Sequence, residues 1–75
     1  MKHFFVKFSE ADQMVKFVRI ISRYDYDAFI KCDSRIVDAK SIIGVLSIAT
    51  SKTLEVILNT ENCDDLIDQL APFAA

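Results

Sequence analysis

The chain has 75 residues, 52% of them hydrophobic and 27% charged, and its formal net charge is −2. This length predicts one domain over residues 1–75 and argues against a deep substrate cavity, because such short chains bury only roughly 60% of their unfolded surface. The slightly acidic balance gives no overall attraction to nucleic acid or to an anionic membrane. We therefore expect a small binding or carrier protein rather than an enzyme.

Membrane-spanning and secreted proteins are also disfavoured. The longest uncharged run, residues 41–51, is far shorter than the roughly 20 apolar residues that a membrane span needs. Residues 1–7 return to charge after a short apolar run and lack a cleavage pattern, which predicts a cytoplasmic protein. Cys32 and Cys63 lack the spacing of a zinc site, so we expect buried reduced thiols and neither a metal nor a cofactor.

The N-terminal part of the chain predicts a strand followed by a helix. Residues 4–8 are aromatic and β-branched, as is typical of a short strand. Ser9 with Asp12 fits a capping box at the start of a helix of about twelve residues. The residues expected on its buried face are Ala11, Met14, Val15, Val18 and Ile21.

The opposite face of this helix carries a basic stripe, which consists of Lys16, Arg19 and Arg23. A solvated surface is the simpler interpretation of such a stripe, and a partner-binding site is the alternative.

The middle of the chain predicts a hairpin and a short helix. The hairpin strands are residues 28–32 and 35–38, joined at Asp33 and Ser34. Ser41 then caps a short helix over residues 42–47, which Gly44 makes marginal.

The C-terminal part predicts a strand over residues 53–59 and a final helix that is ended by Pro72. The apolar residues of that helix are Cys63, Leu66, Ile67 and Leu70. The order β-α-β-β-(short α)-β-α implies an α+β fold with a four-stranded antiparallel sheet, one face of which is covered by the two long helices.

A family resemblance is carried by residues 38–49, which read DAKSIIGVLSIA. This run resembles the regulatory-serine segment of the HPr phosphocarrier family, where Lys-Ser precedes an apolar-apolar-Gly-Val turn. At lower stringency the similarity extends over about residues 4–73. It implies an HPr-like open-faced β-sandwich and a role in the bacterial sugar phosphotransferase and carbon catabolite system.

The resemblance also indicates a Crh-like member that lacks the active-site histidine. In the family, the phosphoryl group from phosphoenolpyruvate is carried on a histidine within a Gly-Ile/Leu-His-Ala-Arg-Pro pattern. Counting back from Ser41 without gaps places Glu10 at the histidine position and Asp12 at the arginine position. Neither supplies a neutral imidazole or a cation for the phosphoryl oxygens. His3, the single histidine, is interpreted as an ordinary strand residue, so we expect no histidine phosphocarrier activity.

Helix capping is the favoured role for Glu10 and Asp12. A metal or paired-carboxylate site and an imitation of phosphohistidine by Glu10 are weaker alternatives. An unrecognised phosphoacceptor elsewhere in the chain remains a third reading of the function.

Ser41 is the expected regulatory phosphorylation site. A phosphate at a helix N-cap meets free backbone N–H groups and the positive end of the helix dipole. In the family, an ATP-dependent HPr kinase/phosphorylase modifies the matching serine, and the product is a corepressor for a LacI-type catabolite control protein. The alternative is that Ser41 is only a cap.

The expected partner-binding residues are Gln13, Ile42, Ile43 and Leu46. The family resemblance places Gln13, Ile43 and Leu46 on its partner surface, and Ile42 belongs to the same short helix. Packing of the apolar residues into the core is the alternative. An unmodified interaction module that binds a partner through Ile43, Leu46 and the basic stripe is therefore the second functional hypothesis. The oligomeric state stays open.

Overall fold

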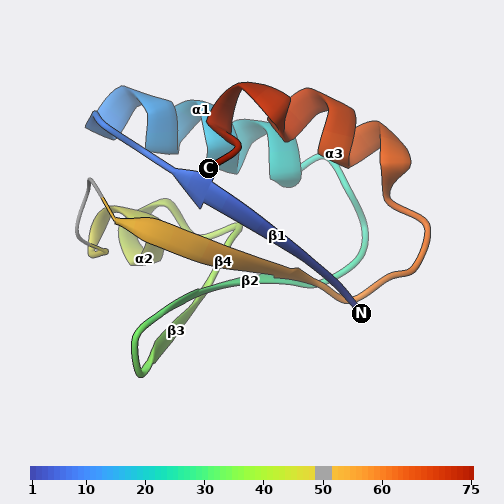
Figure 1. The fold of residues 1–75 in the computed structure, drawn as a ribbon, viewed down its shortest axis with the longest axis horizontal. Helices are drawn as coiled ribbons and strands as arrows, with labels where there is room; N and C mark the ends of the chain where they lie inside the picture. The colour runs from blue at the N-terminus through green and yellow to red at the C-terminus, as the bar shows by residue number, and fades with distance from the viewer. Residues whose placement is uncertain (49–51) are drawn as a thin grey trace.

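The computed structural model describes residues 1–48 and 52–75. The strands and helices follow the predicted order (Figure 1). They are β1 (Lys2–Lys7), α1 (Ala11–Ile21), β2 (Ala28–Cys32), β3 (Arg35–Asp38), α2 (Ile42–Leu46), β4 (Thr53–Leu58), α3 (Asp64–Leu70) and a 3₁₀ turn (Ala71–Phe73).

The four strands form one antiparallel sheet in the order β1-β4-β2-β3. Helices α1 and α3 lie side by side over one face of this sheet, and α2 contacts α1 and β3 (Figure 1). The predicted α+β architecture, an antiparallel sheet covered on one face by two long helices and a short one, is confirmed.

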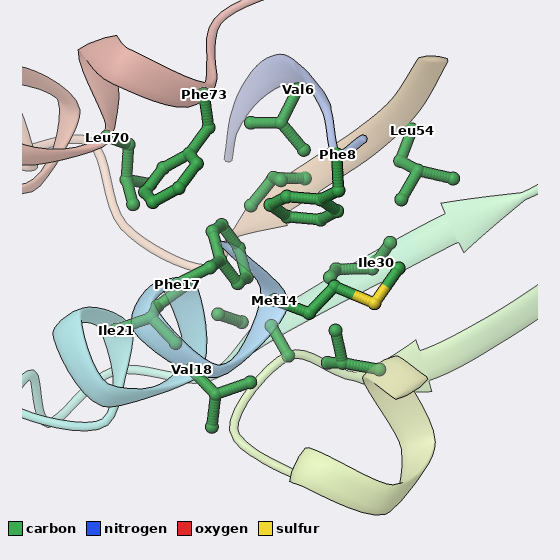
Figure 2. Close-up of a cluster of buried hydrophobic side chains, with 14 of the residues drawn as sticks. Val6, Phe8, Met14, Phe17, Val18, Ile21, Ile30, Leu54, Leu70 and Phe73 are labelled. Carbon is green, nitrogen blue, oxygen red and sulfur yellow. The ribbon is translucent and has the colours of Figure 1, made fainter. Parts of the chain in front are cut away.

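The core lies between the sheet and the helices. Alternate residues of β1 and β4, such as Val6, Leu54 and Val56, point into it and are fully buried. Three aromatic rings from separate parts of the chain meet edge to face, with centroids 5.3 Å (Phe8 to Phe17), 5.7 Å (Phe8 to Phe73) and 6.1 Å (Phe17 to Phe73) apart (Figure 2). This cluster joins the start, the first helix and the end of the chain.

The buried face of α1 differs from the prediction. Its buried residues are Met14, Phe17, Val18 and Ile21. Ala11 is exposed and Val15 is half-buried, so the predicted face was wrong at the first and partly wrong at the second. Phe17 lies within one turn of both Met14 and Ile21, and its ring fills the aromatic cluster.

The capping residues of α1 also differ by one position. The N-cap is Glu10 rather than Ser9, and Gln13 completes the capping box instead of Asp12. The Gln13 Oε1 accepts hydrogen bonds from the Ser9 N–H at 2.6 Å, from the Ser9 hydroxyl at 3.0 Å and from the Glu10 N–H at 3.3 Å. The side-chain amide of Gln13 thus accepts from the backbone N–H groups of both residues that directly precede α1.

Other boundaries shift slightly. Strand β1 begins at Lys2 and ends before Phe8, which is buried beyond the strand. Helix α2 and strand β4 each end one residue earlier than predicted. Helix α3 ends at Leu70, and Pro72 lies inside the following 3₁₀ turn instead of marking the end of the α-helix directly. Proline fits there because early helical positions need no N–H donor.

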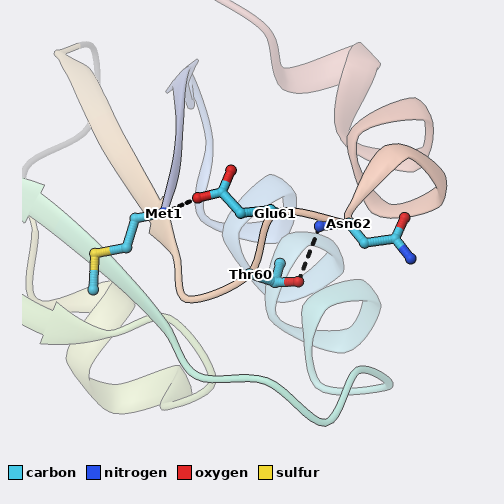
Figure 3. A network of polar contacts seen from close by, with 4 residues as sticks. All are labelled: Met1, Thr60, Glu61 and Asn62. Carbon is cyan, nitrogen blue, oxygen red and sulfur yellow. Dashed lines mark hydrogen bonds and ion pairs between the residues drawn. The ribbon is translucent and has the colours of Figure 1, made fainter.

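Both ends of the described chain are attached to the sheet region. Ala74 pairs with Val6, and the Ala75 N–H donates to the Phe5 carbonyl at 3.0 Å. At the other end, the Met1 ammonium pairs with the Glu61 carboxylate, and this hydrogen bond lowers the pKa of Glu61 (Figure 3).

In the adjoining loop, the Asn62 N–H donates to the Thr60 hydroxyl at 3.1 Å (Figure 3).

Both cysteines are free. Cys63 is buried, and burial raises the pKa of its thiol; Cys32 is only half-buried, so the expectation of a buried thiol holds fully for Cys63 alone. No group of three or more potential metal ligands occurs in residues 1–48 and 52–75. In the same residues, no helix has the length and apolar character needed to cross a bilayer.

Candidate functional site

Ser41 is the N-cap of α2. Its backbone is extended, with φ −96° and ψ 112°, and its carbonyl accepts the first helical hydrogen bond from the Val45 N–H at 2.9 Å. The Ser41 Oγ accepts a hydrogen bond from the Gly44 N–H at 3.2 Å. The side chain is therefore held against the first turn of α2, while the residue keeps part of its surface in contact with solvent.

The segment before Ser41 is anchored by two hydrogen bonds of Lys40. Its N–H donates to the Asp38 Oδ1 at 2.9 Å, and its Nζ donates to the Tyr24 carbonyl at 2.5 Å. The second bond connects the start of α2 to the loop after α1. Together they fix the direction in which the chain enters α2 and thus the position of Ser41.

An apolar patch lies on α2, next to Ser41. We call it the α2 patch; it consists of Ile42, Ile43 and Leu46, which are 37%, 79% and 44% exposed. Val45 is the α2 residue that points into the core. A helix this short turns one side toward the core, so its remaining apolar side chains stay on the surface. The alternative of packing into the core therefore applies to Val45 and not to the α2 patch.

The two carboxylates that the sequence comparison within the family predicted at the histidine and arginine positions, Glu10 and Asp12, lie at the start of α1. Glu10 is the exposed N-cap, and Asp12 lies in the first turn. Within the described residues, neither carboxylate takes part in an ion pair. Both lie near the positive end of the helix dipole, where negative charge is favourable. Gln13 directs its hydrogen bonds to Ser9 and Glu10, and none of them joins it to α2.

His3 lies on β1, on the sheet face that the helices leave open, because its neighbour Phe4 and the buried Val6 point the other way. Its Nδ1 is 2.5 Å from the Glu55 Oε2 on the adjacent strand. The sheet therefore separates His3 from the helix-covered face, on which α1 begins.

The structure also shows a groove that sequence reasoning missed. It lies between α1 and the C-terminal helical segment, has a volume of about 460 Å³, and includes the whole basic stripe. Its lining residues are Gln13, Lys16, Arg19, Ile20, Arg23, Gln69, Pro72 and Phe73. The helical spacing of the three cations was the available signal, but nothing in the local pattern indicated which segment forms the second wall.

The comparisons with known proteins agree on one family. The family model described as the PTS HPr component phosphorylation site matches residues 10–75. No curated protein sequence matches the chain.

Three solved structures resemble the whole fold. A phosphocarrier protein HPr from Bacillus anthracis str. Ames is 26% identical with a TM-score of 0.76, over 99% of this chain and 96% of that one. HPr-C-His from Thermoanaerobacter tengcongensis is 22% identical with a TM-score of 0.77, over 96% and 89%. Crh from Bacillus subtilis, described as a catabolite repression protein that forms an intertwined, domain-swapped dimer, is 28% identical with a TM-score of 0.66, over 88% and 78%.

Proposed function

The chain belongs to the HPr family, and from this premise we propose that it is a regulatory protein that presents Ser41 to partner proteins. Its family places it among the phosphotransferase-system or catabolite-related proteins. The observation that carries the finer proposal is the exposure of the α2 patch directly beside Ser41, with Ile43 79% exposed. Exposed apolar side chains next to a modifiable hydroxyl group provide both an anchor for a partner and a means of regulating it.

Phosphorylation of Ser41 would alter the charge of this surface without removing its apolar anchor. An HPr kinase/phosphorylase transfers the γ-phosphoryl group of ATP to the Ser41 Oγ, which loses its proton, and ADP leaves. The first-turn N–H groups of α2 lie next to this oxygen and favour the added negative charge. A LacI-type catabolite control protein is the proposed partner that binds the chain phosphorylated on Ser41.

A histidine relay has no counterpart in this proposal. Glu10 and Asp12 stand at the start of α1 in place of an imidazole and a cation, and His3 lies on the open face of the sheet. The protein is therefore proposed to act in the bacterial cytoplasm as a binding protein without histidine phosphocarrier activity and without enzymatic activity of its own.

The decisive experiment is incubation with ATP and a purified HPr kinase, followed by intact-mass and peptide analysis. We expect one stable phosphate per chain on Ser41 and none on the Ser41→Ala variant. Ser47→Ala is the matched control, because Ser47 lies at the other end of α2 and its loss should leave the modification intact. An unmodified chain, under conditions in which the same kinase modifies an ordinary HPr, would contradict phosphorylation of Ser41.

A second incubation tests the absence of the histidine relay. With phosphoenolpyruvate and the general phosphotransferase enzyme, we expect no acid-labile phosphate on the chain. A labile adduct on any residue would instead identify an unrecognised phosphoacceptor and would overturn this part of the proposal.

The second candidate function is an unmodified interaction module that binds through Ile43 and Leu46. The same exposed α2 patch favours it, since apolar contact does not require a phosphate. A partner captured equally by the native chain and by Ser41→Ala, but lost with Ile43→Ser, would support this candidate. A partner that also requires phosphorylated Ser41 would support the first.

A further inference from the structure

The groove between α1 and the C-terminal segment combines cations with an apolar floor. Lys16 and Ile20 lie four residues apart on α1 and point in similar directions, and Arg23, just beyond the end of this helix, also lines the groove. Ile20 is half-buried, and Phe73, from the opposite wall, is only 7% exposed. The floor of the groove is therefore apolar, and its rim on the α1 side is basic.

Within residues 1–48 and 52–75, the basic rim has no anionic partner. Ion pairs in the described residues join Met1 to Glu61, His3 to Glu55 and Lys52 to Asp33, and none involves the basic stripe. The acidic residues of α3 do not line the groove. In a chain with a net charge of −2, three unpaired cations around one groove form a local positive field that favours an anionic ligand there.

The spacing of the charges indicates the shape of the ligand. Lys16 lies about 7.5 Å along the helix axis from the end of α1 at Ile21, since an α-helix rises about 1.5 Å per residue, and Arg23 lies two residues further along the chain. An extended peptide covers this distance with about three residues. A single phosphate group is too small to reach both ends of the rim, whereas carboxylates on successive residues of a peptide are distributed over that length.

The opposite wall offers a polar group suited to a peptide backbone. The Gln69 Nε2 donates a hydrogen bond to the Tyr24 hydroxyl at 2.9 Å, which orients the amide. Its Oε1 has no hydrogen-bond partner among the residues that the structure describes and is an available acceptor for a peptide N–H.

We propose that this groove binds a short acidic segment of a partner protein, in which a large apolar side chain is flanked by Asp or Glu residues. The apolar side chain packs against Ile20 and Phe73, and the carboxylates pair with Lys16, Arg19 and Arg23. The groove involves neither Ser41 nor the α2 patch. The groove shares Gln13 with the predicted partner-binding residues, but changes at Lys16 and Arg23 test it without altering Ser41 or the α2 patch.

The test uses the full chain and a fluorescein-labelled peptide, Asp-Glu-Leu-Glu-Asp, blocked at both ends. We expect binding by fluorescence anisotropy that weakens as salt shortens the Debye length from about 30 Å to 3 Å. The neutral peptide Asn-Gln-Leu-Gln-Asn should not bind, and replacing the leucine with serine should weaken binding. Amide shifts in NMR spectra should map to residues 16–23 and 69–73.

Charge reversal tests the location. Lys16→Glu with Arg23→Glu should weaken binding by roughly tenfold or more, because two attractive contacts become repulsive. The matched control, Lys7→Glu with Lys31→Glu, makes the same change in net charge at exposed strand positions on the open face of the sheet and should leave binding unchanged. The double variant Lys16→Ala with Arg23→Ala removes the two charges without reversing them, and it should also weaken binding if the charge-reversed variant misfolds. Ser41→Ala should bind the peptide normally.

Several results would overturn the proposal. They are no binding of the acidic peptide, equal binding by the charge-reversed groove variant and its control, and equal binding of the neutral peptide. Displacement by inorganic phosphate at equal concentration would indicate a general anion site instead, and binding of a single-stranded oligonucleotide in place of the peptide would assign the groove to nucleic acid.

Discussion

The hydroxyl group of Ser41 has a structural role that does not depend on any modification. Its Oγ accepts the Gly44 N–H at 3.2 Å, and this bond satisfies one of the free donors in the first turn of α2. Helix α2 is only five residues long, so a single cap is a large share of its local stabilisation. A partner that recognises Ser41 therefore contacts a residue on which the conformation of α2 depends.

Ser41→Ala should accordingly lower the free energy of unfolding by about 1 kcal/mol, because the Gly44 N–H loses its acceptor. Urea unfolding followed by circular dichroism measures this change. Ser34→Ala, at an exposed turn position, is the control and should stay within about 0.5 kcal/mol of the native chain. Equal stability of the two variants would contradict the capping role.

Cys63 gives the chain a pH dependence at the alkaline end. Burial raises the pKa of its thiol in the folded state above the ordinary value. The stabilisation from the protonated thiol is therefore complete below the ordinary thiol pKa, about 8.5, and is lost as the pH rises through the folded-state pKa. The free energy of unfolding should fall more steeply above about pH 8.5 in the native chain than in Cys63→Ala. Parallel curves for the two proteins would contradict this assignment.

At the scale of elements, the local sequence predicted which segments form helices and strands better than it predicted which residue caps a helix. The hairpin strands end where predicted, since alternation is clear on both sides of Asp33, whose φ of 55° is a conformation that Asp tolerates in turns. The N-cap of α1 was misplaced by one residue because both Ser9 and Glu10 precede the helix. The choice between them depends on the Gln13 amide, a side-chain contact that periodicity does not reveal.

The candidate site was predictable to a similar degree. Ser41 as a cap followed from a serine in front of an apolar run, and the structure agrees. The groove was not predictable, because it joins Lys16 to Gln69 and Phe73, which are distant in sequence. Only the packing of α3 against α1 brings its two walls together.

Helix α2 contains a residue that weakens it. Gly44 is helical, and an added Cβ would lie 3.4 Å from the Ser41 Oγ and 3.5 Å from the Val37 Cβ, which are ordinary contacts. Gly44→Ala should therefore raise the free energy of unfolding by about 0.5–1 kcal/mol, since alanine loses less backbone entropy on folding. Urea unfolding checks the sign. A destabilised variant would mean that Val37 and Ser41 do not accommodate the methyl group.

At the scale of the whole molecule, the aromatic cluster connects distant parts of the chain. Phe17 is fully buried and contacts both Phe8 and Phe73 edge to face. Phe17→Ala should lower the free energy of unfolding by about 3–5 kcal/mol, because it removes apolar burial and leaves a cavity. The exposed Ile36→Ala should change it by less than about 0.5 kcal/mol. Similar losses of stability for Phe17→Ala and Ile36→Ala in thermal unfolding would contradict the arrangement of this core.

The residues that follow the 3₁₀ turn limit how copies of the protein could join. Ala74 and Ala75 occupy the outer edge of β1 at Phe5 and Val6, whereas the outer edge of β3 has no neighbouring strand in the described residues. A sheet with two open edges adds strands at both and grows into a ribbon, but a sheet with one open edge pairs with a single copy and stops. Ala74 and Ala75 thus oppose the addition of a strand along the Phe5–Val6 part of the β1 edge.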